Sequence, residues 1–218
     1  MTICFFCTTW RNTLDKQDYT RIFLVRHGET TDEDTKKIYK GTLDIPLSEK
    51  GITRLKRVAN HLAGYNLDSV YTSVLSRAVE SGRIIAEPHN LDIVPDSSLN
   101  ELYFGRWQGM SFNEIAEKFP DNLSLWLQDP ENHPPLGGEP LLKAQKRIMG
   151  KFREIVNKHQ RENVVIVAHG GALRIILCTL LSIKLSNMFR VAQDNGCINI
   201  VDIYDDSNPV VTLLNFTV

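Results

Sequence analysis

The chain has 218 residues, of which 42% are hydrophobic and 23% are charged, as expected for a globular protein with a substantial core. The formal net charge of −1 does not favour nucleic acid or an anionic membrane as a partner. No stretch is long and apolar enough to span a bilayer, and residues 1–7 lack the basic start of a signal peptide. We therefore expect a cytoplasmic protein.

Residues 1–19 precede the first predicted strand and are expected to form an N-terminal extension, followed by one catalytic domain over residues 20–218. The extension contains Cys4 and Cys7 in a C-x-x-C pattern. A zinc site needs a second pair of ligands at a usable spacing, and a redox motif needs a surrounding βαβ unit. The sequence shows neither, so we expect free thiols and no metal.

The first half of the predicted domain alternates strands with helices. Strands are predicted over residues 21–26, 68–73 and 91–94. One helix begins after a Ser48 cap and ends near Gly64, with an apolar face made of Ile52, Leu55, Ala59 and Leu62. A second helix runs from Ser76 to about Glu87. The long polar stretch between Glu29 and Leu47 is expected to be a loop.

The middle of the chain is less regular. Residues 99–109 have no clean period and predict a structured loop, after which Ser111 and Glu114 form a capping box for a short helix that ends before Pro120. The Pro- and Gly-rich residues 120–140 predict an irregular flap. A long amphipathic helix follows from about Pro140 to His159, with these residues inward: Leu142, Ile148, Phe152, Ile155 and Val156.

The last part of the chain returns to strands. Residues 163–168 predict a buried strand, residues 172–181 a buried helix, and residues 198–204 and 210–217 an antiparallel hairpin. The alternation of strands and helices predicts an α/β fold. We expect a three-layer sandwich with a mostly parallel central sheet, helices on both faces and a C-terminal antiparallel strand.

Two of the predicted strands end in a histidine next to glycine. His27 follows residues 21–26, and His169 follows residues 163–168 and precedes Gly170 and Gly171. Open α/β sheets bind ligands at the carboxyl ends of their strands. Glycines let a ligand approach the backbone, and the N-terminus of the next helix favours an anion such as phosphate.

The remaining residue types fit phosphoryl transfer. Arg26 and Arg77 can hold phosphate oxygens through paired donors. A neutral imidazole is a competent nucleophile, and the expelled oxygen needs a proton from a general acid. Glu101 and Glu29 are the two candidates for that acid.

The segment Leu24-Val25-Arg26-His27-Gly28-Glu29-Thr30 resembles the signature of the histidine phosphatase superfamily, in its phosphoglycerate mutase-like branch. Further segments are similar to motifs of this family and occur in the same order: Asp44 to Gly51, Ser73 to Ala78, Leu99 to Gly109, Gly137 to Glu139, and Val167 to Arg174. The resemblance covers nearly the whole chain after residue 20.

The resemblance implies a role for each site residue. His27 would be the nucleophile that becomes phosphohistidine, and Arg26, Arg77 and His169 would hold the phosphoryl oxygens. Glu101 would protonate the leaving group and later activate the hydrolytic water. Neither a metal nor another cofactor would be required. The residue pattern itself, apart from the resemblance, adds two substrate-binding candidates: Gly170, and Lys40 at the rim of the site.

The sequence departs from the family pattern after the first motif. Asp32 and Glu33 replace a Trp-Asn pair, and Ile38-Tyr39-Lys40-Gly41 replaces Arg-x-Gln-Gly. Lys40 is a candidate substitute for one of the missing substrate-binding groups. Glu33 would repel a phosphate, so we expect its side chain to point away.

The compact segment between Glu101 and His169 favours hydrolysis of a small phosphomonoester over a mutase reaction, because the resemblance links mutases to a longer insertion. α-Ribazole phosphatases, phosphoserine phosphatases and broad-specificity phosphatases of the family are all similar, and the first group is slightly favoured. A phosphoglycerate mutase and a catalytically silent phospholigand-binding protein remain as alternatives, and a homodimer is an open expectation.

Other conspicuous residues are expected to play structural parts. His61, His89, His133 and His159 are predicted at the surface, with His133 able to reach the pocket if the flap closes. Both Trp107 and Trp126 are predicted packing residues, and Trp126 is the better candidate to line the pocket.

Overall fold

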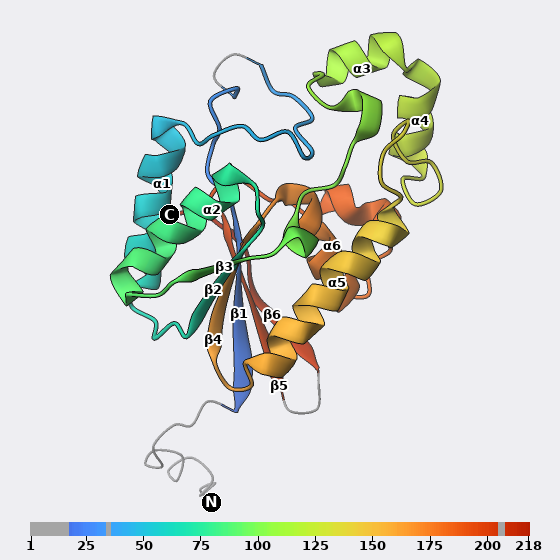
Figure 1. The fold of residues 1–218 in the computed structure, drawn as a ribbon. Helices are drawn as coiled ribbons and strands as arrows, with labels where there is room; N and C mark the ends of the chain where they lie inside the picture. Colours follow the sequence, from blue (N-terminus) through green and yellow to red (C-terminus); the bar gives the residue numbers. More distant parts are fainter. Residues whose placement is uncertain (1–17, 34–35, 205–207) are drawn as a thin grey trace, which may run out of the picture.

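The computed structural model describes residues 18–33, 36–204 and 208–218. Its middle layer is a six-stranded sheet in the order β3-β2-β4-β1-β5-β6 (Figure 1). The strands are β1 Tyr19–Arg26, β2 Ser69–Thr72, β3 Ile93–Pro95, β4 Asn163–Ala168, β5 Ile198–Tyr204 and β6 Pro209–Phe216. Neighbouring strands are parallel from β3 to β1, whereas β5 is antiparallel to both β1 and β6. The predicted mostly parallel sheet with a C-terminal antiparallel hairpin is confirmed.

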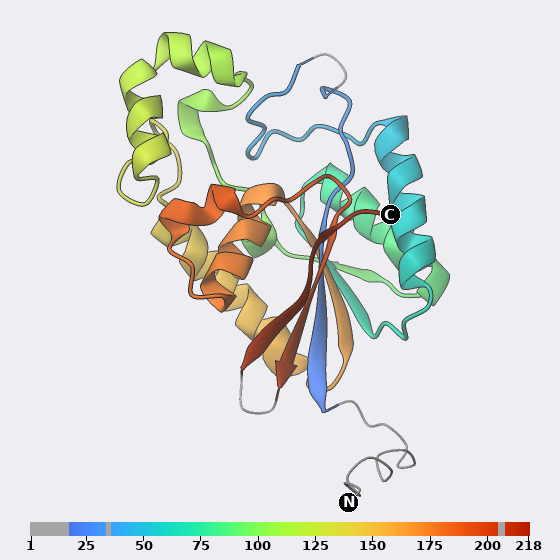
Figure 2. The same ribbon diagram turned by 180° about the vertical axis from the view of Figure 1, so that it is seen from behind.

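Helices cover both faces of this sheet, so the predicted α/β sandwich is also confirmed. Figures 1 and 2 show α1 and α2 on one face and α5 and α6 on the other. The α-helices are α1 Glu49–Leu62, α2 Ser76–Ala86, α3 Phe112–Lys118, α4 Pro120–Gln128, α5 Leu141–Lys158 and α6 Gly170–Leu180. Short 3-10 helices are η1 Glu87–His89, η2 Ser97–Leu99, η3 Gly105–Trp107 and η4 Leu185–Arg190.

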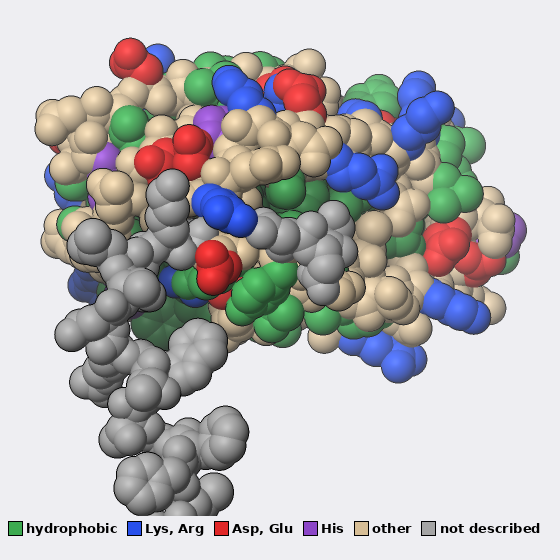
Figure 3. Space-filling model, turned by 90° about the horizontal axis from the view of Figure 1, so that it is seen from below, with side chains coloured by type: hydrophobic (Ala, Val, Ile, Leu, Met, Phe, Trp, Pro, Cys, Tyr) green, Lys and Arg blue, Asp and Glu red, His purple; other side chains and the backbone are tan. Residues whose placement is uncertain are grey.

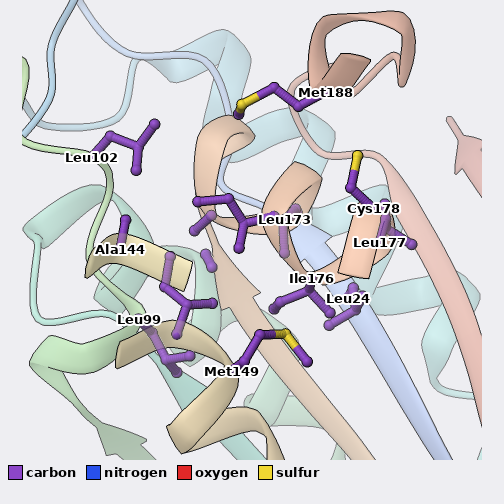
Figure 4. Packing of buried hydrophobic residues seen from close by; sticks show 14 of the residues in the cluster. Leu24, Leu99, Leu102, Ala144, Met149, Leu173, Ile176, Leu177, Cys178 and Met188 are labelled. Atoms are coloured by element: carbon purple, nitrogen blue, oxygen red, sulfur yellow. The ribbon is translucent and has the colours of Figure 1, made fainter. Parts of the chain in front are cut away.

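Strand β1 lies inside the sheet and has no accessible face. Ile22, Phe23, Leu24 and Val25 all have 0% exposed surface, as expected for a central strand with helices on both sides. Phe23 and Val25 pack toward α1 and α2, while Leu24 packs with residues of α5 and α6 such as Met149 and Ile176 (Figure 4). Two separate cores therefore fix the position of the strand that ends at His27.

The predicted helix after Ser48 is confirmed, and its cap is visible. The Ser48 hydroxyl accepts a hydrogen bond from the Gly51 N–H at 3.1 Å, which satisfies one of the free donors at the start of α1. Leu55, Ala59 and Leu62 are buried as predicted, and Ile52 packs against the same core. This helix lies against the loop that follows β1.

The predicted flap over residues 120–140 is only partly irregular. Residues Pro120–Gln128 form α4, in which Leu123 and Trp126 are buried at a helical spacing of three. Proline is tolerated in the first turn of a helix, because its missing N–H would have no partner there. The helix before Pro120 ends as predicted, but the prediction missed that Pro120 also begins a new helix. Residues 129–140 contain no helix or strand.

The inward face predicted for the long helix is wrong at its first position. Leu142 is 57% exposed, whereas its neighbour Leu141 is fully buried. Leu141 lies seven residues before Ile148, so both fall on the same side of an α-helix, and Leu142 is turned about 100° away. Ile148, Phe152 and Ile155 are buried as predicted.

Strand β1 begins at Tyr19, inside the stretch predicted as an extension. Cys4 and Cys7 lie outside the described residues, as does most of the turn between β5 and β6. Figure 3 views the molecule from the amino ends of the parallel strands; acidic and basic side chains are interspersed on the uncovered part of that face. In the ranges that the structure describes, no helix has the length and apolar character needed to cross a membrane.

Candidate active site

The two histidines meet because β1 and β4 are parallel neighbours in the sheet. Arg26 is aligned with Ala168, and the His27 N–H donates to the Ala168 carbonyl at 3.0 Å. The side chains that follow the two strands are thereby brought together, and the ring centroids of His27 and His169 are 5.1 Å apart. The predicted meeting of the two strand ends is present in the structure.

His27 is held in one tautomer. Its Nδ1 lies 2.7 Å from the Gly28 carbonyl oxygen, which can only accept, so Nδ1 carries the proton. The lone pair is then on Nε2. Burial, together with the positive charges of Arg26 and Arg77, lowers the pKa of His27 well below the ordinary 6.5. The imidazole is therefore neutral at neutral pH, the form that a nucleophile requires.

His169, next to His27, is completely buried. Its Nε2 lies 2.6 Å from the hydroxyl oxygen of Ser73, the residue after β2. Its Nδ1 is buried and has no hydrogen-bond partner among the described residues. Burial lowers the pKa of His169 well below 6.5, and the neighbouring His27 and Arg77 act in the same direction.

Arg26 and Arg77 each combine an anchored end with an unused donor. Arg77 donates to the carbonyls of Leu43 and Gly41 at 2.6 and 2.8 Å, and Arg26 donates to the Gln193 carbonyl at 2.5 Å. The Nε of each arginine is buried without a partner among the described residues. Buried donors of this kind are rare unless they serve a function, and two guanidinium groups facing one space favour an anion there.

Glu101 is bound to the N-terminus of α6. Its carboxylate oxygens accept from the backbone N–H groups of Gly171 at 3.0 Å and Ala172 at 3.2 Å, and from Leu102 at 2.9 Å. An acidic group is favourable at this end of a helix. The alternative acid, Glu29, instead pairs with Arg54 of α1 at 3.0 Å. The geometry thus separates the two candidates, because Glu101 lines the same cavity as His27 and Glu29 does not.

These groups surround a cavity of about 300 Å³. The predicted site residues that line it are Arg26, His27, Lys40, Arg77, Glu101 and Gly170. His169 is not among the lining residues, since its side chain is completely buried. Apolar side chains also line the cavity, and we call the following five the apolar wall: Tyr39, Phe104, Phe112, Met188 and Phe189.

Comparison with known proteins places this site in a family. The sequence profile of the histidine phosphatase superfamily (branch 1) matches residues 22–217. The chain belongs to this superfamily. The resemblance seen in the motifs is thereby confirmed.

Several relatives of this histidine phosphatase are named as phosphatases. Phosphoserine phosphatase 1 of Hydrogenobacter thermophilus is 32% identical over 197 residues, 90% of this chain and 92% of the relative. The adenosylcobalamin/alpha-ribazole phosphatase of Salmonella typhimurium is 29% identical over 185 residues, with 84% and 90% covered. The structure of Bacillus stearothermophilus YhfR aligns with a TM-score of 0.83 at 29% identity, covering 89% of this chain and 96% of that one. The protein is a phosphoric monoester hydrolase.

Arg174 is a cavity residue to which the sequence analysis gave no role. It lies in α6, one turn after Gly170, and its Nε donates to the Val191 carbonyl at 2.8 Å. Burial and the charge of Arg26 lower the pKa of Arg174. Its position at the end of the second histidine motif was the available signal. This histidine phosphatase therefore has three arginines around one cavity.

The sequence analysis did not identify the apolar wall, and its expectation for Trp126 is wrong. Trp126 is 1% exposed and does not line the cavity. Its ring packs behind the wall, with centroids 6.4 Å from Phe104 and 6.0 Å from Phe189. Trp107 is a packing residue, as predicted, with 0% exposure.

His159 also differs from its predicted surface position. It is 8% exposed at the end of α5, where its Nε2 lies 2.9 Å from the Tyr71 hydroxyl and its Nδ1 lies 2.6 Å from Glu162 Oε2. Two polar partners make the burial of this imidazole tolerable. It has a structural role on the α5 side of the sheet and does not line the cavity.

Lys40 reaches the cavity, but it is paired with acidic residues. Its Nζ lies 3.0 Å from Glu33 Oε1 and 3.3 Å from Asp32 Oδ2. Asn195 donates to both carboxylate oxygens of Glu33, at 2.9 and 2.7 Å. Burial alone would raise the pKa of Glu33, but Lys40 and Asn195 outweigh it and lower that pKa. Glu33 does not line the cavity, in agreement with the prediction that it points away.

Proposed function

We propose that this protein hydrolyses a small phosphomonoester through a phosphohistidine intermediate on His27. One observation carries the proposal: a neutral histidine lines the cavity, and its Nδ1 is occupied by the Gly28 carbonyl. The remaining nitrogen, Nε2, holds the lone pair that attacks phosphorus. Residues 20–218 form the proposed catalytic domain.

The first step transfers the phosphoryl group to His27. The Nε2 lone pair forms the P–N bond, and the P–O bond to the alcohol breaks. Arg26, Arg77 and His169 stabilise charge on the equatorial oxygens, and the backbone N–H of Gly170 at the start of α6 is a further donor. Glu101 gives a proton to the departing oxygen, so the alcohol leaves neutral.

The second step releases phosphate. A water attacks the phosphohistidine while the carboxylate of Glu101 takes its proton, which restores the acid for the next cycle. The P–N bond breaks and His27 returns to the neutral form. In a phosphoglycerate mutase, a second substrate hydroxyl would take the place of this water. The compact segment between Glu101 and His169 supports the hydrolytic reaction.

The proposed reaction needs no metal, since the arginines neutralise the phosphate charge. In the described part of the chain, no three His, Cys, Asp or Glu side chains cluster as a metal ion would require. A chelator tests this expectation directly. Hydrolysis that stops when chelator is added would contradict it.

The apolar wall supports a substrate in which the alcohol esterified to phosphate carries an aromatic or otherwise apolar group. Tyr39, Phe104, Phe112 and Phe189 offer faces on which such a group can stack. α-Ribazole 5′-phosphate belongs to this class and is our first candidate. Phosphoserine, the substrate in the name of one relative, lacks an apolar group and is the main alternative.

The proposal is tested with a panel of phosphomonoesters in the presence of chelator, followed by acid-quenched trapping of the phosphoenzyme. We expect hydrolysis of α-ribazole 5′-phosphate and a label on His27. His27→Ala should abolish both signals, while His61→Ala, at an exposed histidine of α1, should leave both intact. Absence of a labelled enzyme with every hydrolysed ester would favour a different mechanism. Absence of hydrolysis with retained binding would identify a silent phospholigand-binding protein.

Three further expectations stay predictions. They are a cytoplasmic location, the absence of a nucleic-acid partner and assembly as a homodimer. Sedimentation of the purified protein over a range of concentrations tests the last of them, because a monomer at all concentrations would contradict it.

A further inference from the structure

A clamp behind the active site holds the loop that carries Glu101. It consists of Arg147 in α5 and Glu139 just before that helix. We propose that Arg147 and Glu139 are positioning residues that set the place of the Glu101 carboxyl for proton transfer. This inference rests on the proposed function, because it gives Glu101 the role of general acid.

Arg147 collects the carbonyl groups that lead into the acid. Its Nη1 donates to Ser98 and Asn100 at 2.9 Å each, and its Nη2 donates to the carbonyl of Glu101 itself at 3.3 Å. A single planar guanidinium thus fixes three backbone oxygens within four consecutive residues. Lysine has one point charge and no planar fork, so it cannot reproduce this pattern.

Glu139 fixes Arg147 and the loop beyond the acid. Arg147 Nε and Nη2 donate to its two carboxylate oxygens at 2.9 and 2.7 Å, which is a bidentate pair. The backbone N–H of Glu139 donates to the Tyr103 carbonyl at 2.7 Å. The backbone is therefore held on both sides of Glu101, through Asn100 and through Tyr103.

The glycines before Glu139 permit this close approach. A Cβ on Gly138 would lie 2.9 Å from the Tyr103 carbonyl oxygen, and Gly137 has a φ of +72°. A Cβ on Gly105 would lie 2.4 Å from the Leu136 carbonyl oxygen. The Gly137-Gly138-Glu139 motif thus has a physical purpose: its backbone lies directly against the acid-bearing loop.

Glu101 needs this support because the contacts of its carboxylate do not fix the backbone of the loop. Its carboxylate binds the start of α6, next to His169, but the loop itself contains only short 3-10 helices. A displacement of about 1 Å in a reacting group can cost about 100-fold in rate. The clamp is the structural element that prevents such a displacement.

Dependence on the leaving group distinguishes positioning from plain structural support. An alkyl phosphate expels a poor leaving group and needs the proton from Glu101, whereas dinitrophenyl phosphate expels a stable anion and does not. We compare kcat/KM, because it covers only the steps up to transfer to His27 and excludes hydrolysis of the phosphoenzyme. A misplaced acid should therefore impair only the alkyl ester.

The experiment measures both esters with Arg147→Lys and Glu139→Gln, and takes Glu101→Gln as the reference. General-acid catalysis is typically worth about 100- to 10,000-fold, and Glu101→Gln should lose this on the alkyl ester. We expect Arg147→Lys to lose about 10- to 100-fold on the alkyl ester and less than about threefold on the dinitrophenyl ester. Glu139→Gln, which keeps the three carbonyl bonds, should show the same selectivity with a smaller loss.

The chain offers a matched control in Arg21 and Asp202. This pair is also bidentate, at 2.7 and 2.8 Å, and it joins β1 to β5 away from the acid loop. Arg21→Lys should lower the melting temperature without changing the ratio between the two esters. Equal losses on both esters in the clamp variants, or no loss on the alkyl ester, would overturn the inference. If Arg147→Lys fails to fold, Glu139→Gln decides; if the wild-type protein hydrolyses neither ester, the proposed function itself fails.

Discussion

Gly51→Ala is the sharpest test of how the helix α1 supports the nucleophile. A Cβ on Gly51 would lie 2.2 Å from the carbonyl oxygen of Glu29 and 2.8 Å from its nitrogen. The contact is reciprocal, because a Cβ on Gly28 would lie 2.9 Å from the Gly51 carbonyl oxygen. The backbone that follows His27 thus rests directly on the first turn of α1, and two glycines make this possible.

The size of the effect follows from these distances. Ordinary contact begins near 3.4 Å, so the Glu29 backbone must move by about 1 Å to accommodate the methyl group. Overpacking of this kind costs about 1–3 kcal/mol, which corresponds to roughly 2–12 °C in melting temperature for a chain of this length. Because Glu29 is two residues from His27, a similar displacement of the nucleophile should lower kcat/KM by about 100-fold.

The assay combines thermal unfolding with kcat/KM on a phosphomonoester that the wild-type protein hydrolyses. Gly150→Ala is the control, since Gly150 lies inside α5 and a Cβ there would meet nothing within 4 Å. That substitution should stabilise the protein by about 0.5–1 kcal/mol and leave turnover unchanged. If Gly51→Ala matches Gly150→Ala in both measurements, the proposed contact between α1 and the loop does not position His27.

Three further predictions concern the cavity. Gly171→Ala puts a Cβ 2.4 Å from Glu101 Oε1, a movable side-chain atom, so kcat/KM for an alkyl phosphate should fall by up to about 100-fold with little change in melting temperature; unchanged kcat/KM would contradict this. The pKa values of His27 and His169 are well below 6.5 in the folded protein, so the unfolded chain binds more protons below about pH 6.5. Urea unfolding should show the free energy of unfolding falling from there as pH decreases, and a slope unchanged by His169→Gln would refute the role of that residue. Phe189→Ala should raise KM for α-ribazole 5′-phosphate by about 3- to 10-fold and leave phosphoserine unaffected; equal effects on both would exclude stacking on this wall.

The sequence predicts the sheet and the two histidines well because both depend on local patterns. Residues 22–25 and 164–168 are unbroken apolar runs, and such runs are typical of central strands in α/β proteins. That β1 and β4 are adjacent cannot be read from periodicity, since about 140 residues separate them. The family resemblance placed His27 and His169 at one site, and the structure gives the pairing of the two strands and its register.

The wrong predictions share a physical cause, which is the tertiary partner of a side chain. His159 is buried because Tyr71 and Glu162 bind both of its ring nitrogens, and nothing in the neighbouring sequence indicates Tyr71. The first inward residue of α5 is Leu141 and not Leu142, because the two side chains are equally apolar and only packing decides between them. Trp126 turns inward for the same reason.

The loop that departs from the family pattern contains Asp32, Glu33 and Lys40. Its contacts indicate a different role from the one that the residue types suggest. Lys40 looks like a replacement phosphate ligand, yet the structure gives it two carboxylate partners, Asp32 and Glu33. A cation paired in this way adds little net positive charge to the cavity. We therefore expect the attraction for phosphate to come mainly from the arginines, while Lys40 holds the loop that contains Tyr39. Since Tyr39 belongs to the apolar wall, we expect the altered loop to influence substrate choice mainly by shaping that wall, with Lys40 at the rim of the same cavity.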